Sequence, residues 1–209
     1  ERTRDMNKPT VLLCGYTGAG KTTLIQKICG RSIVSDDKIS HGVPCTQQFD
    51  VYENDFIRFY DSKGLESGEI EKKFAERVKE FVKDRRKDRN LDNHIHLVWY
   101  CIQGSSARVT NCDIDLIKSV FDQENVITLI TKHDITKPQQ EEAIKHRLQE
   151  SGISSDNVLC VSEEDRGSLL DLIQKTYTML PAARRSAFEN AQILDLSRKK
   201  KKALALIHS

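Results

Sequence analysis

The 209-residue chain is long enough for one domain with a sizeable hydrophobic core and a short appendage, since 38% of its residues are hydrophobic. Its net charge of +2 is uneven: residues 182–209 carry seven Lys or Arg and two acids, which gives +5, and residues 1–181 carry −3. This balance excludes a general polyanion binder, so we expect no nucleic acid partner. No run approaches the roughly 18–20 apolar residues of a membrane span, and we expect a cytoplasmic protein.

Six cysteines are spread along the chain without the paired spacing of a zinc site or a disulfide framework. Most of them lie in apolar patterns typical of buried strands and helices. We therefore expect reduced core residues, as in cytosolic proteins. The six are Cys14, Cys29, Cys45, Cys101, Cys112 and Cys160.

Strands and helices are predicted to alternate along most of the chain. A first strand from Thr10 leads into a glycine-rich loop at 15–20, and a helix follows as far as Gly30. Two β-rich runs are predicted to form an antiparallel hairpin. Strands are predicted at 47–52, 56–60, 94–102, 125–131 and 158–161, and later helices at 70–82, 113–121, 138–152 and 168–180. This order predicts an α/β fold with three layers, in which helices cover both faces of a mostly parallel sheet.

The glycine-rich loop has the spacing of a phosphate-binding loop: Gly, four residues, then Gly-Lys-Ser/Thr. Its backbone amides and the N-terminus of the following helix are suited to phosphate oxygens, and the loop lies between a strand and a helix, which disfavours an unrelated glycine-rich turn. Lys21 is expected to contact the β- and γ-phosphates, and Thr22 to bind Mg²⁺. The predicted contacts here are Gly15, Tyr16, Thr17, Gly18, Ala19, Gly20, Lys21, Thr22 and Thr23.

Ligands of such sheets bind beyond the carboxyl ends of the strands, where further motifs occur. Asp61 and Gly64 form Asp-x-x-Gly, which would let the carboxylate hold Mg²⁺ through water and the glycine amide contact the γ-phosphate, although this pattern is also common in ordinary turns. Thr46 ends a long polar loop and would add a hydroxyl to the metal; its alternative is a surface threonine. The predicted metal ligands are Thr22, Thr46 and Asp61, and the predicted catalytic residues are Lys21, Thr46 and Gly64.

The segment 131–134, Thr-Lys-His-Asp, follows a buried strand and is predicted to select the base. The Asp134 carboxylate can accept the N1–H and N2–H₂ groups of guanine together, while the Lys132 stem lies over the ring. Adenine offers no such pair of donors, so the segment favours GTP over ATP. Ser162 would brace this loop, and amides beside it would contact the guanine O6. The predicted base contacts are Thr131, Lys132, Asp134, Ser162 and Glu163.

In this order the motifs resemble the translation-factor class of P-loop GTPases, and the residues after the phosphate loop are most similar to the Era-like and septin/AIG-like branch. The resemblance covers residues 9–181. It implies a six-stranded sheet with one antiparallel strand, binding of GTP and GDP with Mg²⁺, GTP hydrolysis, and switch segments at about 36–47 and 61–72. We expect residues 1–181 to form the GTP-binding domain and residues 182–209 a basic helical extension.

Three residues depart from the family pattern. Thr131 stands where most members have asparagine, Leu65 where Ras-like members have a water-positioning glutamine, and Gly18 where potassium-activated members have asparagine. Because both accelerating groups are missing, we expect slow hydrolysis unless an effector, an activating protein, or a second copy in a homodimer across the nucleotide face supplies a residue. The alternative is a scaffold or oligomerising module in which bound nucleotide shapes an interface.

Two further features leave alternatives open. His94 and His96 alternate on an apolar run and could mimic a metal pair, but hydrogen-bonded strand histidines are far commoner. The extension at 182–209 is rich in helix formers and resembles the segment that joins some Era-like GTPases to a membrane-associated domain. Its five cations at 198–202 favour contact with an anionic membrane. The alternative is a helix that packs against its own domain or a symmetry mate.

Overall fold

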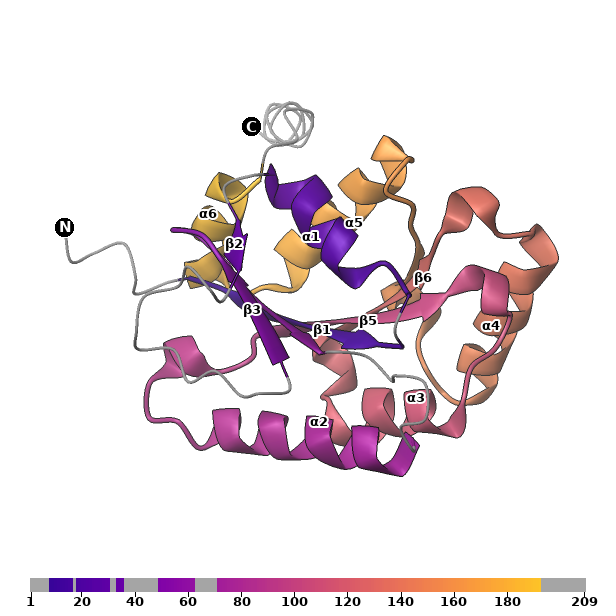
Figure 1. The fold of residues 1–209 in the computed structure, drawn as a ribbon, viewed down its shortest axis with the longest axis horizontal. Coiled ribbons are helices and arrows are strands. Elements are labelled where there is room, and N and C mark those ends of the chain that lie inside the picture. The colour runs from indigo at the N-terminus through magenta and orange to yellow at the C-terminus, as the bar shows by residue number, and fades with distance from the viewer. Residues whose placement is uncertain (1–7, 17, 31–32, 36–48, 63–70, 193–209) are drawn as a thin grey trace.

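The computed structural model describes residues 8–16, 18–30, 33–35, 49–62 and 71–192. Its strands are β1 (Thr10–Gly15), β2 (Val34–Ser35), β3 (Phe49–Glu53), β4 (Arg58–Ser62), β5 (Leu97–Gln103), β6 (Val126–Thr131) and β7 (Val158–Cys160). They form one sheet in the order β2-β3-β4-β1-β5-β6-β7, in which β3 is antiparallel to β2 and β4 and the other pairs are parallel (Figure 1). The predicted six-stranded, mostly parallel sheet with one antiparallel strand is confirmed, and the two-residue β2 extends it at one edge.

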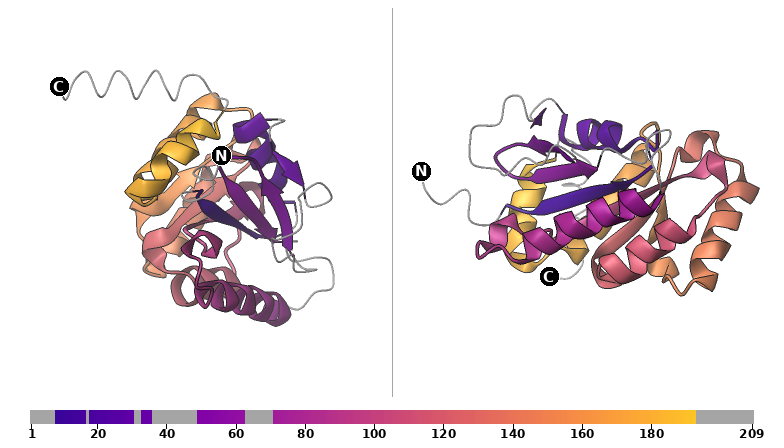
Figure 2. Two further views of the ribbon diagram at one scale, coloured as in Figure 1. Left: turned by 90° about the vertical axis from the view of Figure 1, so that its left-hand side faces the viewer. Right: turned by 60° about the horizontal axis from the view of Figure 1, so that its bottom comes forward.

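Helices cover both faces of the sheet, which confirms the three-layer α/β architecture. One face carries α1 (Lys21–Cys29), α5 (Arg166–Met179) and α6 (Ala182–Asn190), and the other carries α2 (Glu71–Arg86), α3 (Asn111–Asp115) and α4 (Pro138–Glu150). Figure 2 shows α2 lying along the sheet on the side opposite α5 and α6. In β1, Leu12 packs into one core and Leu13 into the other, because successive strand side chains point to opposite faces. The central strands are therefore buried on both sides.

Several described boundaries correct the sequence-based predictions: α2 continues to Arg86 instead of residue 82, and α5 begins at Arg166 instead of residue 168. The helix predicted at 113–121 begins two residues earlier, because Thr110 and Asp113 form a reciprocal cap: the Asp113 amide donates to Thr110 Oγ1 at 3.2 Å and the Thr110 amide to Asp113 Oδ2 at 2.7 Å. It then continues as a π-helical turn at Leu116–Val120. The strand predicted from residue 94 begins at Leu97.

Two histidines form the corner before β5, and hydrogen bonds to backbone explain them. The Thr10 amide donates to His96 Nδ1 at 2.9 Å, and His96 Nε2 lies 3.0 Å from the Leu91 carbonyl. His94 Nε2 lies 2.7 Å from the Asp88 carbonyl. Burial, followed by the charge of Arg184, lowers the pKa of His96 to about 4. The hydrogen bonds of both rings to the backbone support the interpretation of this pair as hydrogen-bonded histidines rather than a metal site.

Helix α6 packs on the body of the domain. Phe188 is fully buried in the core beneath α1 and α5. Arg184 donates to the Lys8 carbonyl at 2.7 Å and pairs with Asp92 at 2.9 Å, so the helix ties the start of β1 to the corner before β5. The predicted division after residue 181 thus falls between two helices that share one core. Residues 193–209, including the cations at 198–202, lie outside the described residues, and the division stays a prediction.

None of the helices in the described ranges combines the length and the apolar character that crossing a membrane requires.

Candidate nucleotide-binding site

The phosphate loop leaves β1 at a glycine that no other residue could replace without moving the backbone. Gly15 has φ +145°, and a Cβ there would lie 2.3 Å from the Cys101 carbonyl oxygen on β5. Gly20 has φ +83° and precedes the first residue of α1. This left-handed conformation turns the chain so that the first amides of α1 face the loop. The local geometry is that of a cradle for an anion at a helix N-terminus.

Lys21 is held inside this loop. Its ammonium donates to the carbonyls of Gly15 at 3.2 Å and Tyr16 at 3.1 Å, and the residue is buried, with 7% of its surface exposed. These two hydrogen bonds hold the loop backbone close around the ammonium charge. Among the described residues its hydrogen bonds go to neutral carbonyls, and a buried cation held in this way attracts phosphate oxygens strongly.

The predicted metal ligands Thr22 and Asp61 lie side by side. The Thr22 hydroxyl donates to Asp61 Oδ2 at 2.7 Å, which joins the start of α1 to the end of β4. Asp61 Oδ1 is buried and has no hydrogen-bond partner among the residues that the structure describes. Burial raises the pKa of Asp61, against the opposing effects of Lys21 and Thr22. A hydroxyl beside a carboxylate oxygen that lacks a partner is a donor set that fits Mg²⁺ and its water ligands.

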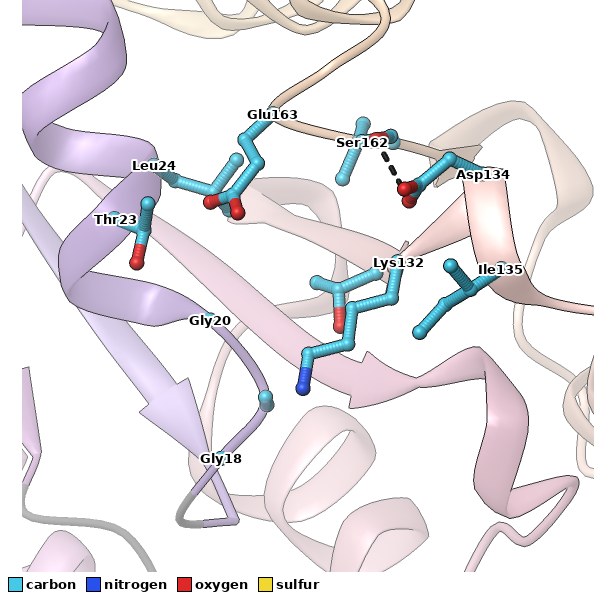
Figure 3. Close-up of a pocket in the computed structure, with 12 residues that line it drawn as sticks. Gly18, Gly20, Thr23, Leu24, Lys132, Asp134, Ile135, Ser162 and Glu163 are labelled. Carbon is cyan, nitrogen blue, oxygen red and sulfur yellow. Dashed lines mark hydrogen bonds between the residues drawn. The ribbon is translucent and has the colours of Figure 1, made fainter.

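The predicted guanine loop and the loop after β7 are joined directly. Ser162 Oγ donates to Asp134 Oδ1 at 2.8 Å, and the His133 amide donates to the Val161 carbonyl at 3.1 Å. Lys132 adopts a left-handed backbone conformation with φ +58°. The Thr136 hydroxyl donates a hydrogen bond to the Lys132 carbonyl at 2.6 Å and helps to hold this conformation. Figure 3 shows the Lys132 side chain extending across the cavity towards Gly20, with Asp134 and Ser162 joined at the far end.

A cavity of about 420 Å³ connects the phosphate loop to this base loop, within the usual size range of small-molecule sites. Nine predicted residues line it: Gly18, Ala19, Gly20, Thr23, Thr131, Lys132, Asp134, Ser162 and Glu163. Three residues that the sequence reasoning missed also line it: Leu24, Ile135 and Val161. Ile135 directly follows the base motif and is 65% exposed, an unusual state for an isoleucine. In the sequence, its position next to Asp134 was the feature that could have identified Ile135 as a residue of the site.

Tyr16 takes part in the site through its backbone, because its side chain leaves the cavity. Its hydroxyl donates to Glu71 Oε1 at 2.9 Å and lies 3.0 Å from Thr110 Oγ1. Glu71 begins α2 and lies at the end of the second predicted switch segment, 61–72. The phosphate loop is thereby attached to the helix in which that predicted segment ends.

Thr131 stands at the position where the family resemblance predicts asparagine. Its side chain is buried and its hydroxyl donates to the Ile102 carbonyl on β5 at 3.4 Å, so it braces the strand end rather than the base loop. Four other predictions, on Thr17, Thr46, Gly64 and Leu65, lie outside the described residues.

Comparison with known proteins assigns the family. A family model described as Septin matches residues 65–183, more than half of the chain. The chain belongs to the septin family. Two curated relatives of this septin come from Saccharomyces cerevisiae. Sporulation-regulated protein 3 is 23% identical over 184 residues, which cover 79% of this chain and 36% of the relative. Sporulation-regulated protein 28 is 22% identical over 174 residues, 60% of this chain and 41% of the relative.

The septin chain thus spans less than half the length of these curated relatives. Among solved structures, Aquifex aeolicus Era bound to GDP·AlF4⁻ matches with a TM-score of 0.55 and 16% identity, covering 84% of this chain and 58% of Era. Toc33 from Arabidopsis thaliana matches with a TM-score of 0.51 and 17% identity, covering 79% and 75%. At these identities the likeness establishes the P-loop GTPase fold.

Proposed function

We propose that this chain binds GTP and GDP with Mg²⁺, hydrolyses GTP slowly, and acts as a nucleotide-dependent switch. One observation carries the proposal: a single cavity has the phosphate-loop residues Gly18, Ala19 and Gly20 at one end and the Asp134–Ser162 pair at the other. Ser162 fixes one carboxylate oxygen of Asp134 and leaves acceptor capacity for the two donors of guanine. Family membership and fold support the same nucleotide.

The residues of the metal end have separate tasks in this proposal. Thr22 and Asp61 would hold Mg²⁺, which supplies positive charge to the β- and γ-phosphates when bound. Lys21 adds a second cation that the loop carbonyls already orient. Such fixed charges stabilise the negative charge of phosphoryl transfer without reorganising during the reaction.

Slow turnover follows from what the sequence lacks. Leu65 offers no group that could orient the attacking water, and Gly18 offers no ligand for a potassium ion. A second copy across the nucleotide face, or an activating protein, would have to supply the missing group. If neither does, the protein is a nucleotide-locked scaffold or oligomerising module, the alternative that septin membership also supports.

Phosphate release from GTP and Mg²⁺, measured over a range of protein concentrations, tests the proposal. A slow rate per chain supports the switch, and a rate per chain that climbs with concentration adds self-activation. Stable nucleotide binding with no phosphate release favours the scaffold.

Lys21→Ala is the site variant, and Lys27→Ala, an exposed lysine on the same helix, is its matched control. Lys21→Ala is expected to lower GTP affinity by a factor of 100 or more, on the order of 3 kcal/mol for a lost charge-assisted contact, whereas Lys27→Ala retains wild-type affinity. Equal affinity in both variants would remove the site assignment.

A further inference from the structure

Behind the base loop, three chemically different metal-ligand side chains converge from three elements. They are His133, in a short 3₁₀ turn at His133–Ile135, Glu141 on α4, and Cys160 at the end of β7. One ring nitrogen of His133, a carboxylate oxygen of Glu141 and Cys160 Sγ all lie within 4.8 Å of one another. Imidazole, carboxylate and thiolate at such spacing can reach one ion with small side-chain movements.

The burial of this group distinguishes it from an ordinary surface pair. The Glu141 side chain is 9% exposed and forms a hydrogen bond with His133 Nδ1, whose side chain is 44% exposed. On the same helix, His146 and Glu150 form a comparable pair at 3.5 Å, but both side chains are more than half exposed and no sulfur accompanies them. A buried carboxylate needs a positive partner, and the half-exposed imidazole leaves a route by which an ion can enter.

We propose that His133, Glu141 and Cys160 bind one divalent transition-metal ion, for which Zn²⁺ is the best match. Zinc accepts all three ligand types and commonly combines three protein ligands with a fourth, open position for water. Hard ions such as Mg²⁺ prefer sets composed of oxygen, so the thiol separates this site from the one at Thr22 and Asp61.

Binding requires the deprotonated ligands, and the proton balance is simple. The Cys160 thiol loses one proton to solvent as the sulfur–metal bond forms. The proton that His133 Nδ1 donates to Glu141 also leaves that nitrogen, passing to solvent if the ring is charged or being replaced by one on Nε2 if it is neutral, so that Nδ1 can bind the ion. Burial, with the charge of Glu141, raises the pKa of Cys160 to about 11, while Lys145 opposes this rise. The free thiol is therefore protonated at neutral pH, and the metal displaces its proton.

The position of the site gives it a consequence for nucleotide binding, a part of the inference that rests on the proposed function. His133 adjoins Asp134, and Cys160 lies two residues before Ser162. Asp134 and Ser162 are the residues whose side chains are hydrogen-bonded at 2.8 Å at the base end of the cavity. The backbones of the same two loops are bonded between His133 and Val161. A metal that bridges His133 and Cys160 clamps both loops and slows the release of guanine nucleotide.

Cobalt(II) titration of the full chain tests the metal site, because a thiolate bound to Co²⁺ gives near-ultraviolet charge-transfer absorption that Zn²⁺ abolishes by displacement. We expect this absorption to saturate at one equivalent in the wild type, to disappear in Cys160→Ser, and to persist in Cys112→Ser.

His133→Ala is expected to weaken Zn²⁺ affinity at least tenfold, since even groups behind metal ligands typically contribute that much. His146→Ala is the matched control and should retain wild-type affinity. Absence of the absorption in the wild type, or its persistence in Cys160→Ser, overturns the proposal.

Separate experiments check that the variants fold and that metal binding slows nucleotide release. Thermal unfolding of Cys160→Ser without metal should match that of the wild type, and if this variant fails to fold, His133→Ala carries the test, because its side chain is substantially exposed. Release of a fluorescent GDP analogue in excess Mg²⁺ should slow several-fold on adding Zn²⁺ to the wild type and remain unchanged in His133→Ala. Equal release with and without Zn²⁺ rejects the clamp. Failure of all nucleotide binding would instead reject the proposed function, and the cobalt spectrum would still report the metal site.

Discussion

The Thr22 hydroxyl donates to Asp61 Oδ2 at 2.7 Å, while Asp61 Oδ1 is buried and finds no hydrogen-bond partner within the described ranges. Without a metal this carboxylate carries a penalty, because burial raises its pKa. The protonated form therefore favours folding. Its stabilising contribution is complete below the ordinary pKa of 3.8 and is lost as the pH rises through the raised value.

We predict from this relationship that Asp61→Asn changes stability and metal binding in opposite directions. In the nucleotide-free protein, the stability of the variant relative to the wild type rises as the pH increases from 4 to 7, because asparagine carries no charge. With nucleotide present, the variant loses most of the gain in GTP affinity that Mg²⁺ gives the wild type. Thermal unfolding over this pH range and GTP titrations with Mg²⁺ or EDTA measure both effects. Asp55→Asn, at an exposed position, is the control, and a variant that matches the wild type in both assays contradicts the assignment.

The base end yields a specificity prediction. Asp134→Asn replaces an acceptor by a group that also donates, so the variant should lose guanine and gain xanthine, whose carbonyl accepts that donor. We expect a drop of at least 100-fold in GTP affinity and a preference for XTP. Competition of GTP and XTP against a fluorescent nucleotide measures the change, with the exposed Asp156→Asn as control. If Asp134→Asn still prefers GTP to XTP, Asp134 does not bind the guanine base.

How much of this site the sequence predicted depends on the range of the contacts involved. The phosphate loop, Asp61 and Asp134 are recognisable because their chemistry needs residues at fixed local spacing after a strand. The bond between Tyr16 and Glu71 joins residues 55 positions apart and has no local signal. Ile135 also lines the cavity, beyond the left-handed Lys132, and only its position next to Asp134 pointed to it in the sequence.

The strands and helices, too, were predictable where a local pattern defines them and not where long-range contacts do. Apolar periodicity located the central strands, yet it placed the start of β5 at His94, because an alternating His-x-His pattern imitates a strand while the rings actually bind backbone carbonyls. The packing of α6 was one of two open alternatives. Arg184 bonds to groups that lie 92 and 176 positions away along the chain, and such contacts appear only in the folded structure.

The kinetic prediction concerns potassium. Isolated protein should hydrolyse GTP at or below about one turnover per minute and no faster in KCl than in NaCl, since Gly18 supplies no ligand for the ion. Gly18→Asn should introduce potassium stimulation. Asparagine tolerates the φ of +84° at this position better than most residues, and a Cβ there comes no closer than 3.9 Å to its nearest neighbour, Gln103 Oε1. Strong stimulation of the wild type by potassium would show that another residue binds the ion.

The last prediction separates the two parts of the C-terminal segment. Phe188 is fully buried against α1 and α5, and Arg184 bonds to the Lys8 carbonyl and to Asp92. A chain that ends at residue 181 loses this packing and should be less stable by at least about 3 kcal/mol, the usual cost of deleting a buried phenylalanine. A chain that ends at residue 192 retains α6 and should unfold at the wild-type urea concentration.

The chain that ends at residue 192 also tests the expected membrane contact separately from folding, because it keeps α6 and lacks the cations at 198–202. The five cations at 198–202 should hold the full chain on phosphatidylserine vesicles at low salt, at up to roughly 1 kcal/mol for each cation near the surface, and release it as salt screens the charge. The chain ending at residue 192 should no longer sediment with the vesicles, yet should bind GTP as the full chain does. Neutral phosphatidylcholine vesicles are the control. If the shortened and full chains sediment equally with anionic vesicles, the cations do not contact the membrane, and a helical arm for protein contacts is the better explanation of the segment.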